Sequence, residues 1–128
     1  MAELDYAFLA EYAQITDGNL TVVNASFIHV KVPVPTVFQL AIAGRVRAPA
    51  DAGEVRVDIQ FNGPDENAPT VKFQMNLNTE GHPVYDNKVG ILFAVRAGVF
   101  IATHGLYVAT IDVDGKKART LAFEALPL

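Results

Sequence analysis

Hydrophobic and polar residues alternate along most of this chain, and turn-forming residues interrupt the alternation about every dozen residues. In Glu54–Phe61 every second residue is Val, Ile or Phe and the others are polar, and Val71–Leu77 repeats this pattern. Both segments are expected to be strands with one face to water. Val89–Val95 is almost entirely apolar, which favours a strand buried on both faces near the middle of a sheet.

The first segment, Leu4–Ile15, has hydrophobic spacing that fits either a helix or a strand. We expect a strand, because the dipeptide Asp17-Gly18 suits the positive φ angles of a tight hairpin and directly precedes the β-prone run Leu20–Val23. If these two residues form the loop, the register predicts three facing pairs: Ile15 with Leu20, Glu11 with Asn24, and Phe8 with Phe27.

Prolines and side-chain alternation define the next strands. Pro33 and Pro35 are expected to end the second strand, because proline cannot donate a hydrogen bond to a ladder. The third strand is predicted over Val37–Val46 with its even-numbered side chains in the core. Arg45 and Arg47 then point outward.

The last two strands, Gly105–Val113 and Ala118–Ala125, are expected to form a hairpin around Asp114-Gly115, and Asn62–Pro69 is expected to be a turn. Two registers of the hairpin remain open. One pairs Val108 with Leu121, and the other pairs Ala109 with Leu121 and Tyr107 with Phe123.

Together these segments make about eight strands, with no helix to cover a parallel sheet. The sequence therefore predicts an all-β fold, an antiparallel β-sandwich in one domain over residues 1–128, with a closed barrel as the second possibility. A chain of 128 residues that is 51% hydrophobic can bury one core of this kind.

Composition excludes several classes of function. No apolar run reaches the roughly 18 residues of a membrane span, and the acidic start lacks the features of a secretory signal, so we expect a cytoplasmic protein with no membrane partner. The chain has no cysteine, which rules out thiolate chemistry. Its net charge of -4 and scattered basic residues argue against binding to nucleic acid.

Motifs at both ends of the chain resemble a family of small uncharacterised bacterial proteins, a domain of unknown function. The matching motifs are Ala10-Glu11-Tyr12-Ala13, Asp17–Val23, Pro33-Val34-Pro35, Gly105-Leu106-Tyr107 and Asp112–Gly115 followed by Phe123. The middle half is unmatched, and the sequence departs from the family pattern at Asn19, where lysine is usual, and at Asn24, where glycine is expected. The resemblance implies a bacterial β-sandwich and carries over no functional residue.

No catalytic, cofactor or metal site is expected from the residues. His29, His82 and His104 lack the spacing of local metal ligands, and Ser26 lacks the strained turn that a nucleophile requires. Acidic turns at Asp17, Asp51, residues 80–86 and residues 112–114 are expected at one end of the fold, where carboxylates are able to hold calcium.

Five residues are candidates for an interaction site. Glu11 lies in mid-strand, where its carboxylate must face water or find a partner such as Arg45 or Arg47. His82 and Tyr85 belong to a polar stretch between two strands.

The leading hypothesis is a non-catalytic protein-interaction or structural module that binds another bacterial protein or itself as a homodimer, through a sheet face or an edge strand. The alternative is a sandwich that binds a small ligand or cation through the acidic loops. An enzyme with an unfamiliar site is a third and weaker possibility.

Overall fold

The computed structural model describes residues 1–66, 68 and 70–128, and every regular element in this part of the chain is a strand. No helix of the described residues is long and apolar enough to cross a membrane. The strands are β1 (Glu3–Thr16), β2 (Asn19–Ala25), β3 (His29–Lys31), β4 (Thr36–Pro49), β5 (Glu54–Asn62), β6 (Val71–Asn78), β7 (Val84–Tyr85), β8 (Lys88–Ile101), β9 (Gly105–Val113) and β10 (Lys116–Leu126).

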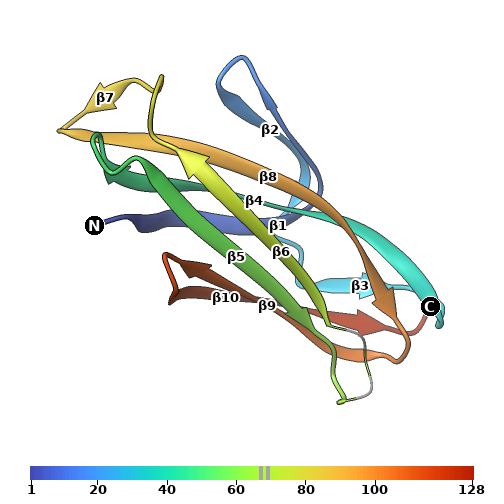
Figure 1. Cartoon of the computed structure of the whole chain (residues 1–128). Helices are drawn as coiled ribbons and strands as arrows, with labels where there is room; N and C mark the ends of the chain where they lie inside the picture. The colour runs from blue at the N-terminus through green and yellow to red at the C-terminus, as the bar shows by residue number, and fades with distance from the viewer. Residues whose placement is uncertain (67, 69) are drawn as a thin grey trace.

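The strands form two five-stranded sheets (Figure 1). The first sheet has the order β2-β1-β4-β8-β7 and the second the order β3-β10-β9-β5-β6. The all-β class is confirmed, but the described residues form ten strands rather than about eight, because the short strands β3 and β7 were not expected. The described pairings are antiparallel except for that of β3 with β10, which is parallel.

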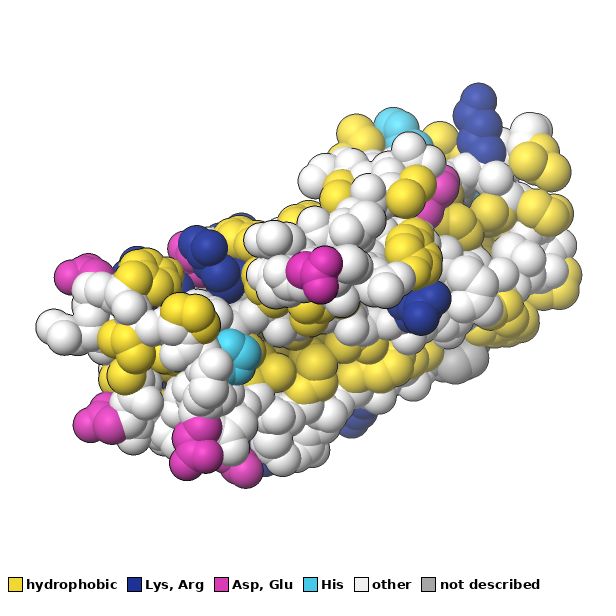
Figure 2. Space-filling view, turned by 90° about the horizontal axis from the view of Figure 1, so that it is seen from above, with side chains coloured by type: hydrophobic (Ala, Val, Ile, Leu, Met, Phe, Trp, Pro, Cys, Tyr) yellow, Lys and Arg dark blue, Asp and Glu magenta, His cyan; other side chains and the backbone are white. Residues whose placement is uncertain are grey.

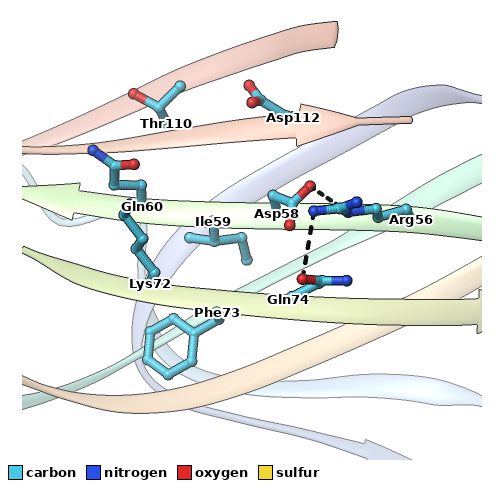
Figure 3. Close-up of a pocket in the computed structure, with 9 residues that line it drawn as sticks. All are labelled: Arg56, Asp58, Ile59, Gln60, Lys72, Phe73, Gln74, Thr110 and Asp112. Atoms are coloured by element: carbon cyan, nitrogen blue, oxygen red, sulfur yellow. Dashed lines mark hydrogen bonds and ion pairs between the residues drawn. The ribbon is translucent and has the colours of Figure 1, made fainter. Parts of the chain in front are cut away.

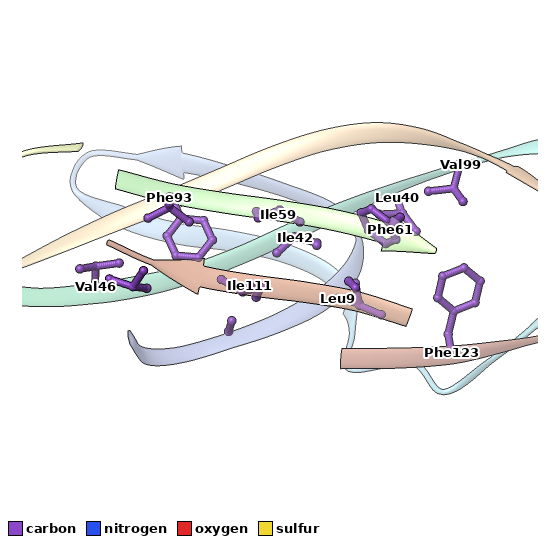
Figure 4. Packing of buried hydrophobic residues seen from close by; sticks show 14 of the residues in the cluster. Leu9, Leu40, Ile42, Val46, Ile59, Phe61, Phe93, Val99, Ile111 and Phe123 are labelled. Atoms are coloured by element: carbon purple, nitrogen blue, oxygen red, sulfur yellow. The ribbon is translucent and has the colours of Figure 1, made fainter. Parts of the chain in front are cut away.

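One hydrophobic core lies between the two sheets (Figure 4). It forms because strands of both sheets place every second side chain on the same face, and the alternation predicted for Glu54–Phe61 is confirmed in β5. The side chains drawn in the core include Leu9, Leu40, Ile42 and Phe93 of the first sheet and Ile59, Phe61, Ile111 and Phe123 of the second.

Four aromatic rings pack against one another at one end of this core. Phe123 contacts Phe27, Phe38 and Tyr107 with ring centroids 5.5–6.0 Å apart. The hydroxyl of the fully buried Tyr107 donates a hydrogen bond to the carbonyl oxygen of Thr103 at 2.8 Å, so this polar group is satisfied.

The first hairpin has the predicted register near its turn but not at its far end. Ile15 pairs with Leu20, and the amide of Asn24 donates to Glu11 at 2.8 Å. The predicted pair of Phe8 with Phe27 is wrong. Asn24 and Ser26 adopt positive φ angles of 50° and 64°, which turn the chain out of β2 and direct Phe27 into the aromatic cluster.

The same turn divides the predicted second strand. β2 ends at Ala25, well before Pro33, and the chain crosses to the other sheet, where His29–Lys31 adds β3 alongside β10. A short strand of three residues at a sheet edge leaves little exposed backbone.

Burial on both faces is found in β4 rather than in β8. Residues 40–44 of β4 are all buried, because its outer face is covered by the hairpin of β1 and β2. In the predicted two-faced strand Val89–Val95, Ile91 and Phe93 are buried but Leu92 and Ala94 are only half-buried. β7 covers only the first two residues of β8, so β8 lies at a sheet edge along most of its length.

The last hairpin adopts the second of the two registers, with Ala109 opposite Leu121 and Tyr107 opposite Phe123. A register shift between Lys117 and Arg119 supplies the extra residue that this alignment needs. The predicted turn at 62–69 includes residues 67 and 69, which lie outside the described part of the chain.

Candidate functional site

A β-bulge in β1 builds the first part of the site. Leu4 pairs with Val46 and Tyr6 with Arg45, so Asp5 is an extra residue in β1. The bulge places both Asp5 and Tyr6 against the guanidinium group of Arg45. Arg45 donates from Nε to Oδ2 of Asp5 at 2.8 Å, and its Cζ lies 5.1 Å from the ring centroid of Tyr6. The hydrogen bond to Asp5 raises the pKa of Arg45.

Gly44 allows the two strands to approach at this bulge. A Cβ atom at this position would lie 2.8 Å from Cζ of Phe93 and even closer to the carbonyl oxygen of Tyr6. No other residue fits here without a shift of the β1 backbone.

Arg47 lies on the same face of β4 and contacts the hairpin of β7 and β8. Its Cζ is 5.0 Å from the ring centroid of Tyr85, and its guanidinium is 4.0 Å from the exposed carboxylate of Asp86. Its buried Nε has no hydrogen-bond partner among the described residues. Beside it, Lys88 lies 3.7 Å from Glu3.

The hairpin of β1 and β2 curls over the outer face of the first sheet. Ala13 at its base is buried with Ala41 and Ala43 of β4, and Leu20 and Phe8 pack against this small second cluster. In Figure 1 the hairpin rises from the same side of the sheet as β7.

A groove of about 290 Å³ lies between the hairpin tip, β7 and the outer face of β4 and β8. Figure 2 views the molecule from this side and shows a band of hydrophobic side chains with acidic and basic groups around it. The residues that line the groove are Tyr6, Gly18, Asn19, Leu20, Arg45, Pro83, Tyr85, Gly90 and Leu92.

Three of the five predicted interaction residues come together here, since Arg45 and Tyr85 line the groove and Arg47 stacks under Tyr85. Glu11 does not join them. It is exposed and bonded to Asn24, because β1 leaves β4 after Ala10 and carries Glu11 away from both arginines.

His82 is half-buried in the turn before β7, adjacent to the groove residue Pro83. The other two histidines lie elsewhere: Nε2 of His104 is 2.9 Å from the carbonyl oxygen of Val32, and His29 is 3.6 Å from Glu124.

The groove adjoins an open strand edge. β4 pairs with β8 from Lys88 to Ile101, whereas β7 pairs only with Lys88 and Val89. Residues 90–101 of β8 therefore have a neighbouring strand on one side only, among the described residues. Gly90 and Leu92 belong both to this edge and to the groove.

The backbone groups of even-numbered residues in β8 point toward the open side. The two-residue turn Asp86-Asn87, with φ angles of 51° and 59°, closes the hairpin at the pair Tyr85 and Lys88, so Lys88 directs its N–H and C=O groups at β7. The direction of the backbone groups alternates from one residue to the next along a strand, so the odd-numbered residues face β4. In agreement, the N–H of Ala50, just after β4, donates to the carbonyl oxygen of Asn87 at 3.4 Å. The outward-directed residues are Gly90, Leu92, Ala94, Arg96, Gly98 and Phe100.

Of the other edges, β6 and β10 carry mainly polar or charged residues at the equivalent positions, whereas the shorter β2 directs Leu20, Val22 and Asn24 outward. In β6, Thr79 continues the ladder with β5 by donating to Gly53 at 2.8 Å, so the outward-directed residues include Lys72, Gln74 and Asn76. Glu124 of β10 donates to the carbonyl of Ile28, and Lys116 closes the turn to β9, so the outward-directed residues in the free part of β10 include Lys117, Thr120 and Ala122. Charged and polar side chains protect edges from strand addition, and the edge of β8 has only Arg96.

A second hollow, of about 570 Å³, lies on the outer face of the second sheet (Figure 3). Arg56 bridges Asp58 at 2.9 Å and Gln74 at 3.4 Å. Asp58 lies directly opposite Asp112 in the pairing of β5 with β9, which brings two carboxylates side by side. The remaining lining residues are Ile59, Gln60, Lys72, Phe73 and Thr110.

The acidic turns do not assemble a cation site in the described part of the chain, which contains no group of three His, Asp or Glu residues suited to a metal. Asp86 faces Arg47 instead, and the carboxylate of Asp114 accepts a hydrogen bond from the backbone of Arg56 at 2.9 Å.

Sequence reasoning missed Asp5, Tyr6 and the edge of β8. The bulge at Asp5 has no marker in the local pattern, because it depends on the partner strand. Gly90 and Gly98 were a usable signal, since glycine inside an apolar run marks a bulge or a close approach of backbone.

Comparison with protein families shows what the chain is related to. The model described as "Family of unknown function (DUF6941)" matches residues 5–125, and the chain belongs to this family. The match also covers the middle of the chain, which the motif resemblance did not reach. A search of curated proteins gives no match.

Among solved structures, the chain is similar to the alkylpurine DNA glycosylase AlkC of Pseudomonas fluorescens, bound to DNA that contains an abasic site analog. The TM-score is 0.53 at 11% sequence identity, and the similarity covers 94% of this chain and 30% of that one. The likeness therefore concerns the fold alone, and this chain corresponds to less than a third of the glycosylase.

Proposed function

We propose that this chain is a non-catalytic protein-interaction module, a β-sandwich whose partner adds a β-strand to the open edge of β8. The observation that carries the proposal is the row of six outward-directed residues from Gly90 to Phe100, of which only Arg96 is charged. A partner strand would satisfy their N–H and C=O groups, which supplies the main-chain part of the affinity.

The groove beside the edge supports the same proposal. Gly90 and Leu92 line it together with Tyr85 and Arg45, so side chains of an added strand would meet an aromatic ring and an aliphatic arginine stem. Main-chain pairing along the edge and side-chain contacts in a neighbouring pocket together give specificity.

We place this module in the bacterial cytoplasm and expect a protein partner rather than nucleic acid. The net charge of -4 offers no counterion-release advantage for phosphate binding. The glycosylase likeness covers the fold of this chain and less than a third of that protein, and the proposal does not use it.

The test compares proline variants on two edges. Gly98→Pro removes an outward N–H from β8, and Asn76→Pro removes one from β6, so neither breaks the ladder to its neighbouring strand. A partner recovered with the tagged wild-type protein is expected to bind Asn76→Pro and to be lost by Gly98→Pro, with both variants folded in thermal unfolding.

The recovered partner is then purified, and hydrogen exchange of the module is measured with and without it. We expect slower exchange at the outward-directed amides of β8, those of the even-numbered residues from Gly90 to Phe100. Equal binding by Gly98→Pro, or protection confined to other strands, would contradict strand addition at β8.

A second candidate function is ligand or cation binding on the outer face of the second sheet. It is favoured by the facing carboxylates of Asp58 and Asp112, since like charges directly opposite on neighbouring strands reduce stability and Arg56 forms an ion pair with Asp58 alone of the two. Calcium is then expected to raise the melting temperature of the wild type and a chelator to reverse this, with no response in Asp112→Asn. An unchanged wild-type melting temperature would eliminate this candidate.

A further inference from the structure

The edge of β8 has a residue pattern that fits a second copy of itself. In an antiparallel pair about a two-fold axis, the same strand faces itself in reverse order. The outward-directed residues must oppose one another, because these residues exchange the hydrogen bonds. The sequence of their side chains from residue 90 to residue 100 is Gly, Leu, Ala, Arg, Gly, Phe.

Only one of the nearby registers uses the whole edge. An axis at Arg96 would set this residue against its own copy, and like charges directly opposite are destabilising. An axis at Ala94 would set Gly90 against Gly98 and leave Phe100 opposite Lys88, which already pairs with β7. An axis at Val95 uses all six outward-directed residues and opposes no like charges, and only Ile101, the last residue of β8, would face a position that already pairs with β7.

With the axis at Val95, small residues face large ones along the outer face. Gly90 faces Phe100, Leu92 faces Gly98, and Ala94 faces Arg96 of the other copy. Arg96 is held by its own chain, with Cζ 5.0 Å from the ring centroid of Tyr12, which keeps it from the neighbouring arginine.

The core-facing side of the strand is equally compatible. Ile91 would face Val99, Phe93 would face Ala97, and Val95 would face its own copy, so every pair is apolar. Val95 is only half-buried in one chain, although its neighbours Phe93 and Ala97 on this face are buried.

This register also gives the groove an occupant. Phe100 is 40% exposed in one chain, and opposite Gly90 its ring would enter the space beside Tyr85 and Arg45. A Cβ atom on Gly90 would lie 3.6 Å from the ring of Tyr85, which shows how close this ring is to the edge. Aromatic pairs of this kind add to the area that they bury.

We propose, on the basis of the function proposed above, that the strand added to β8 is β8 of a second copy, antiparallel about a two-fold axis at Val95. The first sheets of the two chains then form one continuous sheet. The groove of each copy receives Phe100 of the other.

Cysteine variants test both the partner and the register, because the chain has no cysteine of its own. In this dimer Val95 and its copy form a non-hydrogen-bonded pair with Cα atoms about 4.5 Å apart, within the range of a disulfide. Under mild oxidation Val95→Cys is expected to form a covalent dimer nearly completely. Ala97→Cys is the matched control. In this register position 97 faces Phe93 of the other copy, four residues from position 97 of that copy, so the two cysteines cannot meet and the variant stays without a covalent link.

Light scattering of the wild type at several concentrations is the second measurement. We expect twice the 13.8 kDa of one chain, and a single-chain mass for Gly98→Pro. A wild-type monomer at all concentrations, or equal crosslinking of both cysteine variants, would overturn the self-pairing. If the wild type were monomeric but bound a different protein, and Gly98→Pro lost that binding, the proposed interaction function would still hold.

Discussion

Phe123→Ala is expected to lower the free energy of unfolding by about 3–5 kcal/mol, which threatens the stability of a domain of this size. Phe123 is 1% exposed and is the ring that contacts Phe27, Phe38 and Tyr107. Its removal leaves a cavity that these three rings fill only in part, because each is attached to a different strand or connection. Chemical denaturation followed by circular dichroism measures the loss.

Leu106→Ala is the matched control for this prediction. Leu106 neighbours Tyr107 in β9 but is 51% exposed, so its truncation is expected to change the stability by less than about 0.5 kcal/mol. If the two variants were equally stable, the aromatic cluster would contribute little and the packing described for that end of the core would be wrong.

Gly44→Ala is expected to cost about 3 kcal/mol through overpacking. The added methyl group would collide with the backbone carbonyl of Tyr6 and with the ring of Phe93, and the carbonyl is unable to move without breaking the bulge. The displaced bulge would also separate Asp5 from Arg45. The same denaturation measurement gives the stability, and NMR of the Arg45 side chain reports the lost hydrogen bond.

Gly98→Ala is the comparison variant, because its Cβ would meet only side chains, Cγ1 of Val37 at 2.9 Å and Nε2 of Gln39 at 3.1 Å. Val37 is 54% exposed and is free to rotate, so the expected cost is below about 1 kcal/mol. A cost at Gly44 as small as that at Gly98 would show that the two strands tolerate separation at the bulge.

Local turn chemistry and alternation predicted most of the strands correctly. Asp17-Gly18 set the pair of Ile15 with Leu20, and the alternation in Glu54–Phe61 identified a strand with one buried face. These features depend on residues close in sequence, where steric preference and side-chain period act directly.

Features that depend on a distant strand were not predictable in the same way. The apolar run Val89–Val95 looked central, but its burial on the outer face depends on a neighbour, and β7 is only two residues long. The route of Phe27 into the core depends on the backbone at Ser26, a conformation that few residues adopt and that sequence pattern does not reveal.

The candidate site was predictable only as a set of outward-facing side chains. Arg45 and Arg47 were expected on the outer face of their strand, and they lie there. Their partners were not foreseen, because Asp5 reaches Arg45 through a bulge and Tyr85 reaches Arg47 through a two-residue turn. Each contact combines segments about 40 residues apart, and only the strand order brings them together.

The parallel pairing of β3 with β10 has a consequence for how the chain folds during synthesis. His29 pairs with Glu124, so β3 has no ladder to join until β10 leaves the ribosome. Phe27, which precedes β3, also lacks its ring contact with Phe123 until β10 has been synthesised. Pairings between such distant residues close large loops and form slowly. The second sheet is therefore completed after translation of this domain, and until then the apolar residues at that end of the core need protection from aggregation.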